Sequence, residues 1–287
     1  MSDLVWWQMT LIGLLFVWGG FVRSGLGFGG AVLTLPFLLM VYNAPLVYLP
    51  IISVHLLFFS GLTILQAHLR ARRALRGGAR RSDARRDDAR RSDARHDDVA
   101  APEAAGTVNW PFLRYAFTLM LVPKLIGVAG VLTLPATVVS SFIFLVVGAY
   151  AVSYILQRPF KSNSPRVDAA LLMLGGYVSG TSLIAAPLVV PVAASRVARH
   201  ELRDTLFVLW FVLVAIKLAA FAWTGVDLQW RQHLWLLPCA AIGHVLGLRF
   251  HAYTLRADTA VFFRVLGVGL LTVSVVGLVR MVSQSMG

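Results

Sequence analysis

Long, almost uninterrupted apolar runs dominate the chain. An α-helix needs about 20 apolar residues to cross the hydrocarbon core of a bilayer. The apolarity of these runs is continuous rather than alternating, which favours helices over the strands of a β-barrel. Seven runs predict membrane-spanning helices: residues 4–22, 46–69, 112–134, 138–156, 205–224, 234–250 and 259–279.

Two further apolar stretches, 27–42 and 167–194, are interrupted by Gly, Ser and Pro. Irregular backbone at membrane depth is tolerated where it is buried in protein or lines a cavity, so these stretches predict half-helices or re-entrant hairpins. The predicted fold is therefore all-α: a polytopic helical membrane protein with about 7–9 transmembrane segments. The pattern leaves open whether the two stretches cross the bilayer or dip into it.

Composition agrees with a membrane protein. Hydrophobic residues make up 58% of the 287 residues, more than a soluble domain of this length can bury, so the bilayer is the expected surrounding. The net charge of +13 comes from arginines between the apolar runs, which read as topology signals and not as a nucleic-acid surface. The first run has no basic flank before it and no cleavage site after it, so we expect it to be retained.

A charged tract separates the second and third runs. It repeats a pentad, for example Arg80-Arg-Ser-Asp-Ala and Arg90-Arg-Ser-Asp-Ala, and contains almost no large apolar residue. Such a segment cannot build a core, so we expect a cytoplasmic loop, either flexible or helical. Binding to anionic lipid headgroups is the alternative.

The positive-inside rule orients the chain. With the charged tract in the cytoplasm, every other basic loop falls on the same side, and the two halves of the chain then have opposite orientations. The protein is predicted to be a multi-pass protein of the cell (inner) membrane built as an inverted repeat. The first repeat comprises residues 1–69 and 107–157 with the charged loop 70–106 inserted, 158–166 is the connection, and 167–287 is the second repeat.

A short internal match supports the repeat. Residues 19–25, Gly-Gly-Phe-Val-Arg-Ser-Gly, match residues 175–180, Gly-Gly-Tyr-Val-Ser-Gly, with Arg23 inserted. Beyond the insertion, Pro191 stands 155 positions after Pro36. The interrupted stretches are therefore predicted to be equivalent parts of the two halves.

The first copy of this motif is rich in glycine. Gly25, Gly27, Gly29 and Gly30 follow Ser24, and glycine permits the backbone to leave the helix and present N–H groups to a ligand. Half-helix N-termini carry partial positive charge, so the predicted ligand is an anion. The alternative is that these glycines only let helices pack closely.

The second copy carries hydroxyl groups in place of the later glycines. Ser179, Gly180, Thr181 and Ser182 precede two prolines, at 187 and 191, that favour a helix break. We expect the hydroxyls to contact the ligand, and the alternative is that they bond back to their own helix.

Ionisable residues inside apolar runs are costly and point to function. Lys217 is the clearest candidate for anion binding, and Lys124 is the corresponding candidate in the first half. A structural ion pair is the alternative for both. His55 and His244 are candidate proton relays, with packing as their alternative, and Arg23 is a candidate to guide anions or to mark an interface.

The sequence lacks the residues expected for metal binding, ATP-driven transport or cation transport. Cys239 is the only cysteine, and no His or Cys cluster has metal-ligand spacing, so neither a metal nor another cofactor is expected. The chain has no phosphate-binding loop, and acidic residues are scarce in the apolar runs. These absences argue against ATP-driven transport by this chain and against a cation carrier.

The stretch from Gly20 to Pro36, Gly-Phe-Val-Arg-Ser-Gly-Leu-Gly-Phe-Gly-Gly-Ala-Val-Leu-Thr-Leu-Pro, resembles the motif that opens transporters of the TauE/SafE sulfite-exporter family. The region from Gly176 to Gly225 is similar to the second half of that family, so the resemblance covers nearly the whole chain outside the charged tract. It implies an inner-membrane carrier of two inverted helical repeats that moves sulfite, sulfonates or other small organic anions, commonly with proton coupling.

The resulting hypothesis is a secondary transporter that binds a small anion between the breaks at 24–30 and 179–182 and works by alternating access, with protons as a candidate coupling ion. It is not expected to be an enzyme. Two alternatives stay open: a non-transporting membrane scaffold, and an intramembrane hydrolase that pairs Ser24 or Ser179 with His244 or His55. The sequence leaves the anion, the direction of transport and the oligomeric state undetermined.

Overall fold

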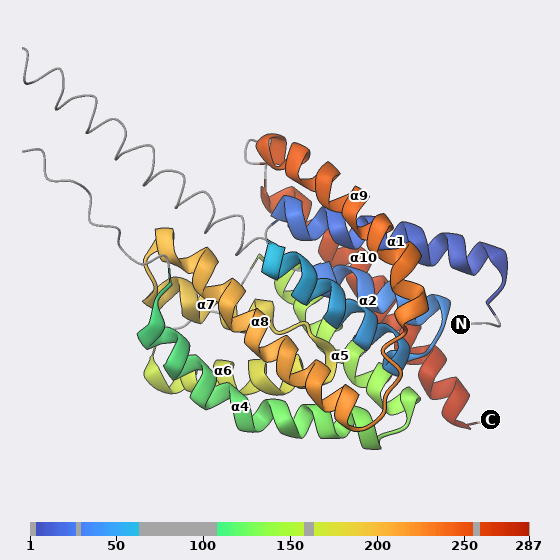
Figure 1. The fold of residues 1–287 in the computed structure, drawn as a ribbon, viewed down its shortest axis with the longest axis horizontal. Helices are drawn as coiled ribbons and strands as arrows, with labels where there is room; N and C mark the ends of the chain where they lie inside the picture. The colour runs from blue at the N-terminus through green and yellow to red at the C-terminus, as the bar shows by residue number, and fades with distance from the viewer. Residues whose placement is uncertain (1–3, 27–29, 63–107, 158–163, 255–258, 287) are drawn as a thin grey trace, which may run out of the picture.

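The structure is a computed structural model that describes residues 4–26, 30–62, 108–157, 164–254 and 259–286. These residues form helices and connections without any strand (Figure 1). The charged tract 70–106 and most of the connection 158–166 lie outside the described residues. The helices are α1 (Trp6–Leu26), α2 (Gly30–Val41), an unlabelled helix (Pro45–Leu62), α4 (Trp110–Thr133), α5 (Ala136–Ile155), α6 (Pro165–Ser182), α7 (Ala186–Arg196), α8 (Arg199–Trp223), α9 (Trp230–Thr254) and α10 (Thr259–Met286).

Five helices of the described chain are long and apolar enough to cross a membrane: Pro45–Leu62, α4, α5, α8 and the Arg264–Gln284 part of α10. Helices α1 and α9 are also long, with 21 and 25 residues, but they are not among these five. The prediction of a helical membrane protein is confirmed at this level. The finer count of 7–9 crossings stays a prediction.

Large apolar side chains cover the outside of the bundle. Val122, Leu145 and Val265 are 62%, 61% and 69% exposed, and they belong to α4, α5 and α10. Outward-facing apolar surface on several helices is what a lipid surrounding requires, since hydrocarbon is the solvent that such surface prefers.

The first interrupted stretch forms a hairpin with α1. Helix α1 ends at Leu26 and α2 begins at Gly30, and the two helices run side by side in opposite directions. A Cβ on Gly30 would lie 2.9 Å from the Arg23 Cβ, and a Cβ on Gly19 would lie 3.3 Å from the Thr34 Cγ2. At the open end, Gln8 Nε2 donates to Val41 O over 3.4 Å. The predicted interruption is confirmed, and the chain turns back after it.

The second interrupted stretch forms another hairpin. Helix α6 ends at Ser182, Leu183 adopts the left-handed conformation with φ of 62°, and α7 begins at Ala186. Left-handed backbone is rare for a side chain such as leucine, so it terminates the helix here. Pro187 lies in the first turn of α7, where its missing N–H is tolerated. The predicted break is confirmed, and it falls just after Ser182.

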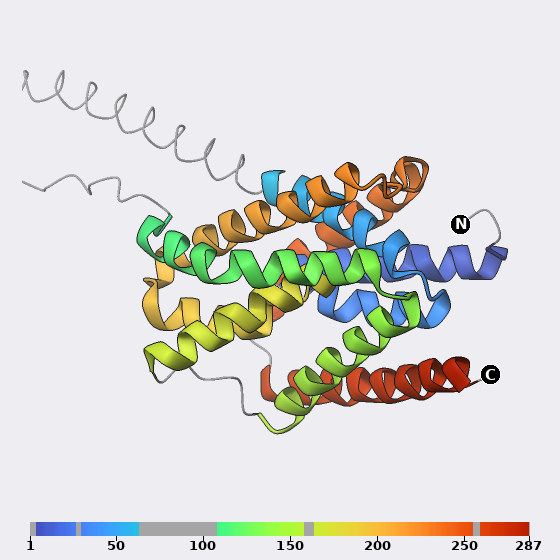
Figure 2. The same ribbon diagram turned by 90° about the horizontal axis from the view of Figure 1, so that it is seen from below.

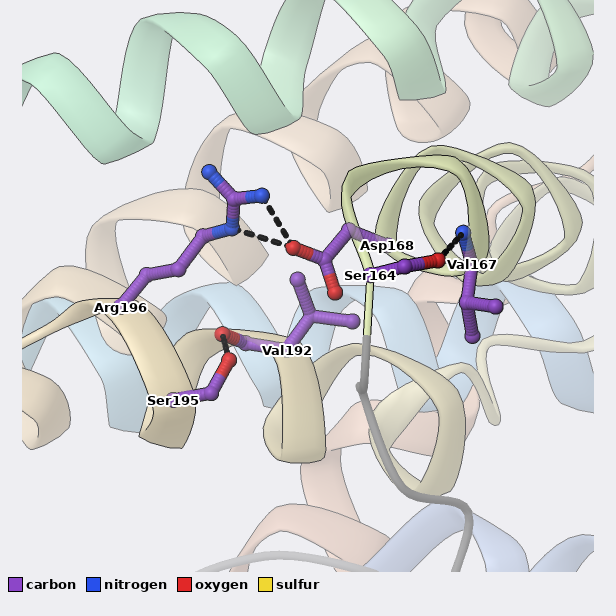
Figure 3. A network of polar contacts seen from close by, with 6 residues as sticks. All are labelled: Ser164, Val167, Asp168, Val192, Ser195 and Arg196. Atoms are coloured by element: carbon purple, nitrogen blue, oxygen red, sulfur yellow. Dashed lines mark hydrogen bonds and ion pairs between the residues drawn. The ribbon is translucent and has the colours of Figure 1, made fainter.

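A half-buried ion pair closes the open end of this second hairpin (Figure 3). The Asp168 carboxylate of α6, with a side chain 4% exposed, accepts from the Arg196 guanidinium at the end of α7. The same guanidinium lies 4.9 Å from the centroid of the Tyr115 ring of α4. Ser164 caps α6 beside it by accepting from Val167 N over 3.3 Å. The hairpin is thus attached both to itself and to α4.

Close helix crossings hold the two hairpins in the bundle. Helix α1 packs on α9, α6 packs on α4, and α5 packs on α10. Both hairpin crossings use glycines whose Cα positions meet the backbone of the partner helix, as small residues do in membrane helix packing. These glycines are Gly20, Gly243 and Gly247 in the α1–α9 crossing, and Gly127, Gly176 and Gly180 in the α4–α6 crossing.

The two hairpins open toward opposite ends of the bundle. Helix α1 begins, and α10 ends, at the right-hand end of Figure 1, whereas α6 begins and α7 ends at the left-hand end; Figure 2 gives the same arrangement from below. The inner ends of both hairpins, where α1 and α6 end and α2 and α7 begin, therefore lie in the interior, between the two ends of the molecule.

Filling the α4–α6 crossing is expected to destabilise the protein. A Cβ on Gly176 would lie 2.8 Å from the Met120 Cα, whereas a Cβ on Gly269 of α10 would meet nothing within 4 Å. Gly176→Ala should lower the free energy of unfolding by about 1–3 kcal/mol through overpacking, measured by thermal unfolding in detergent. Gly269→Ala is the matched control and should be neutral or stabilising, because alanine favours a helix. Equal effects of both substitutions would contradict the close crossing.

Candidate functional site

A cavity lies between the two hairpin turns, and we call it the central cavity. Its volume is ≈ 70 Å³, enough for several water molecules or one small polyatomic ion, because a single water needs about 10–15 Å³. The first hairpin, the Pro45–Leu62 helix, the second hairpin and α8 all contribute to its wall. The polar and charged groups and helix ends in the wall are Arg23, Gly30, Ser60, Ser179 and Ala186, and Phe207 and Trp210 supply aromatic surface.

Arg23 supplies the formal charge in this wall. Its Nη1 donates to His55 O over 3.3 Å, and its Nη2 donates to Leu56 O over 3.4 Å and to Ser60 Oγ over 3.5 Å. The guanidinium also lies 4.9 Å from the centroid of the Phe59 ring. A guanidinium has five N–H donors in a planar fork, so these contacts fix its position while leaving donors for a ligand.

Two helix N-termini also face the central cavity. Gly30 begins α2 and Ala186 begins α7, and both residues line the wall. A helix N-terminus carries partial positive charge, but in α7 Pro187 has no N–H and Leu188 N donates to Ala185 O over 3.0 Å, so these two residues offer no donor to a ligand. No carboxylate is among the residues that line this cavity. The electrostatics therefore favour an anion.

The hydroxyls of the second motif divide into two groups. Ser179 lines the central cavity and accepts from Lys124 Nζ over 2.9 Å. Thr181 Oγ1 donates to Tyr177 O over 3.2 Å, and Ser182 Oγ donates to Val178 O over 2.9 Å. Thr181 and Ser182 therefore bond back to their own helix, which was the alternative to contacting a ligand. Of the three hydroxyl residues, only Ser179 lines the central cavity.

The two buried lysines meet the end of α6 and not the cavity. Lys217 Nζ donates to Thr181 O over 3.2 Å, and Lys124 Nζ also approaches Ser179 O at 3.4 Å. Both side chains are 0% exposed. Carbonyl groups in the last turn of a helix lack intrahelical donors, so the lysines stabilise α6 where it breaks. Sequence reasoning identified the cost of burying these lysines but not this role.

A second cavity, which we call the histidine cavity, adjoins the first. Its volume is ≈ 50 Å³, and its polar lining consists of Arg23, Ser24, Thr34, His55 and His244. Ser24 Oγ and His244 Nδ1 are 2.5 Å apart and share a hydrogen bond. The structure thus brings four of the predicted residues together. Sequence reasoning missed Thr34, because a threonine in an apolar run carries no charge to mark it.

The predicted glycines divide into those that line a cavity and those that pack against another helix. Gly30 lines both cavities, whereas Gly25 lies against Gly247 of α9. Gly180 packs on Gly127 of α4, where a Cβ would lie 3.0 Å from the Gly127 Cα. Gly27 and Gly29 lie outside the described residues. In the part of the chain that the structure describes, His, Cys, Asp and Glu form no group that could hold a metal ion.

Comparison with known proteins assigns no relative to this chain. No protein-family model matches it, and neither a curated protein nor a solved structure matches it.

The Lys124–Ser179 contact predicts that Ser179→Ala destabilises the protein and that adding Lys124→Met recovers part of the lost stability. Ser179→Ala should lower the free energy of unfolding by about 1–3 kcal/mol, because it removes the hydroxyl acceptor of the buried Lys124 Nζ. Adding Lys124→Met should recover part of that loss, since the buried charge is then absent. Thermal unfolding of the two single variants and the double variant measures the coupling. A double variant as unstable as the sum of the singles would contradict the contact.

Proposed function

We propose that the protein is a secondary transporter of a small anion, of the TauE/SafE type. The observation that carries the proposal is the composition of the central cavity, where Arg23 and the N-termini of α2 and α7 converge and no carboxylate is present. Arg23 and the two helix N-termini in that wall favour a negative ligand, whereas the C-terminal end of α6, represented there by Ser179 and Leu183, carries the opposite partial charge.

The chemistry of the wall favours a compact oxyanion with a small organic part. A guanidinium binds the oxygens of sulfite, sulfonate or carboxylate groups through parallel N–H donors. Ser60 and Ser179 add hydroxyl groups, and Phe207 and Trp210 offer aromatic surface to a carbon substituent. Sulfite, a sulfonate or a related organic anion is therefore the proposed substrate.

Alternating access between two inverted halves is the proposed mechanism. The hairpins open toward opposite ends of the bundle and turn beside one shared cavity (Figures 1 and 2). Each hairpin packs on a helix from the other half, α1 on α9 and α6 on α4. Such an arrangement allows one half to rock against the other around a fixed site.

The packing details support the equivalence of the halves. His244 of α9 contacts Ser24 at the end of α1, and Lys124 of α4 contacts Ser179 near the end of α6. His244 stands 120 positions after Lys124. The same offset relates Ala240, which meets Gly20, to Met120, which meets Gly176. We propose the cell membrane as the location, with residues 70–106 in the cytoplasm.

An intramembrane hydrolase is the second candidate, because Ser24 and His244 lie within hydrogen-bond distance. A serine–histidine pair can form a nucleophile. No carboxylate is among the residues that line the histidine cavity, so nothing there orients the imidazole as the third member of a triad would. Covalent labelling of Ser24 by a fluorophosphonate would favour the hydrolase over the transporter.

Flux through the purified protein tests the transporter. In proteoliposomes we expect flux of sulfite, methanesulfonate or acetate, and Arg23→Gln should lower it more than about tenfold. The reason is that a hydrogen bond to a charged group contributes about 1.5–3 kcal/mol. Arg280→Gln is the matched control, since Arg280 is exposed on α10 and bonds Met40 O away from both cavities. Its flux should equal that of the wild type.

Lys217→Met tests whether Lys217 binds the anion or stabilises the fold, by comparing anion flux with thermal unfolding. Lys217 is bonded to Thr181 O and does not line either cavity, so this variant should lose thermal stability more than anion affinity. Correctly folded wild-type protein that moves none of the three anions would overturn the proposed function and favour the scaffold.

A further inference from the structure

Arg23 stands between two cavities and belongs to the wall of both. Gly30, Ala31 and Leu56 are the other shared residues, so the cavities adjoin where α1, α2 and the Pro45–Leu62 helix meet. A charge in either cavity therefore acts on the same guanidinium across a short distance, in an apolar surrounding that screens it weakly.

The histidine cavity has polar atoms that the protein does not satisfy. Thr34 Oγ1 and His55 Nε2 have no hydrogen-bond partner among the described residues, and their side chains are 3% and 5% exposed. Buried polar atoms of this kind normally bond to water or to another ligand. The cavity volume of ≈ 50 Å³ accommodates a few water molecules, which can deliver a proton.

The Ser24–His244 pair is suited to hold that proton. A hydroxyl is both donor and acceptor, so Ser24 Oγ can donate to Nδ1 of a neutral His244 and can accept from it once His244 is protonated. The hydrogen bond therefore survives in both states. On the other hairpin the corresponding contact is made by Lys124.

The groups around the two histidines are few. His244 faces Arg23 and Ser24 of α1, and its ring centroid lies 5.1 Å from that of Phe59. His55 faces Arg23, and its ring centroid lies 5.2 Å from that of His233 in the first turn of α9. Arg23 is thus the permanent charge that both histidines face, and no carboxylate lines this cavity.

We propose that the histidine cavity is a proton site, with the proton on His244, and that Arg23 links it to the anion in the central cavity. This inference rests on the proposed function. While the central cavity is empty, the Arg23 charge opposes a second positive charge beside it. A bound anion neutralises that guanidinium and removes the opposition. Anion and proton therefore bind together, and the two are carried as a neutral pair.

A route for the proton leads to one end of the bundle. His233 stands four residues from the start of α9, beside Trp230, which is 64% exposed. Its ring contacts His55, whose unsatisfied Nε2 belongs to a residue of the cavity wall. His233 is itself buried, its Nε2 bonds Leu228 O, and His55 and His244 share the cavity wall, so a proton that enters along this route would reach Ser24 through the cavity.

The linkage predicts proton uptake on anion binding. The full-length protein in detergent is titrated calorimetrically with methanesulfonate and with acetate near neutral pH, in buffers of different ionisation enthalpy. Both probes stay ionised there, unlike sulfite, so any proton taken up belongs to the protein. The wild type should take up a measurable fraction of about one proton per anion bound, and lower pH should tighten binding.

Two variants assign the site. His244→Gln should bind the anion with proton uptake and pH dependence reduced to near zero, whereas the exposed His200→Gln should behave as the wild type. Ser24→Ala keeps the imidazole and should move the pH at which proton uptake occurs. This variant tests the assignment if His244→Gln does not fold.

The outcomes separate the two proposals. Anion binding without proton uptake by the wild type overturns the linkage and leaves the proposed transporter intact. Unchanged uptake in His244→Gln and an unmoved profile in Ser24→Ala overturn the assignment to this pair. Absence of binding for every anion, with folded protein, overturns the proposed function together with the linkage.

Discussion

The need to satisfy backbone groups away from water governs this structure. A helix that stops in the interior of a membrane leaves carbonyl groups at its C-terminal end and N–H groups at the start of the next helix without partners. The two hairpin turns create both deficits. Lys124 and Lys217 supply donors at the end of α6, and the first turns of α2 and α7 face the central cavity. The remedy for the first deficit is structural, and the second deficit is the feature on which the proposed anion site rests.

The two turns meet this requirement differently. At the α6 end, buried ammonium groups bond carbonyls directly, so that turn is held without a ligand. At the α1 end, Arg23 instead reaches across to the carbonyls of His55 and Leu56 on another helix, and Ser24 bonds an imidazole. The end of α6 is therefore held by direct contacts, while the charged residue at the end of α1 lines two cavities.

The sequence predicted the helices and both breaks, because apolar length, glycine and proline act locally. It also identified Arg23, Ser24 and Ser179 at the breaks, and His244 as a histidine within an apolar run. It could not place Lys217, since a lysine in an apolar run reveals the cost of burial but not the acceptor, which is a carbonyl 36 positions away. Nor could it pair α1 with α9, because a glycine face fits many helices and the choice is made by the tertiary arrangement.

The crossed pairing of hairpins and helices has a consequence for biosynthesis. Helix α4 precedes α6 in the chain, so the second hairpin finds its partner, with the receiving Gly127, already made. Helix α9 follows α1 by most of the chain, so the first hairpin emerges without the surface that Gly20 requires. The first hairpin therefore cannot reach its packing partner until α9 has been synthesised.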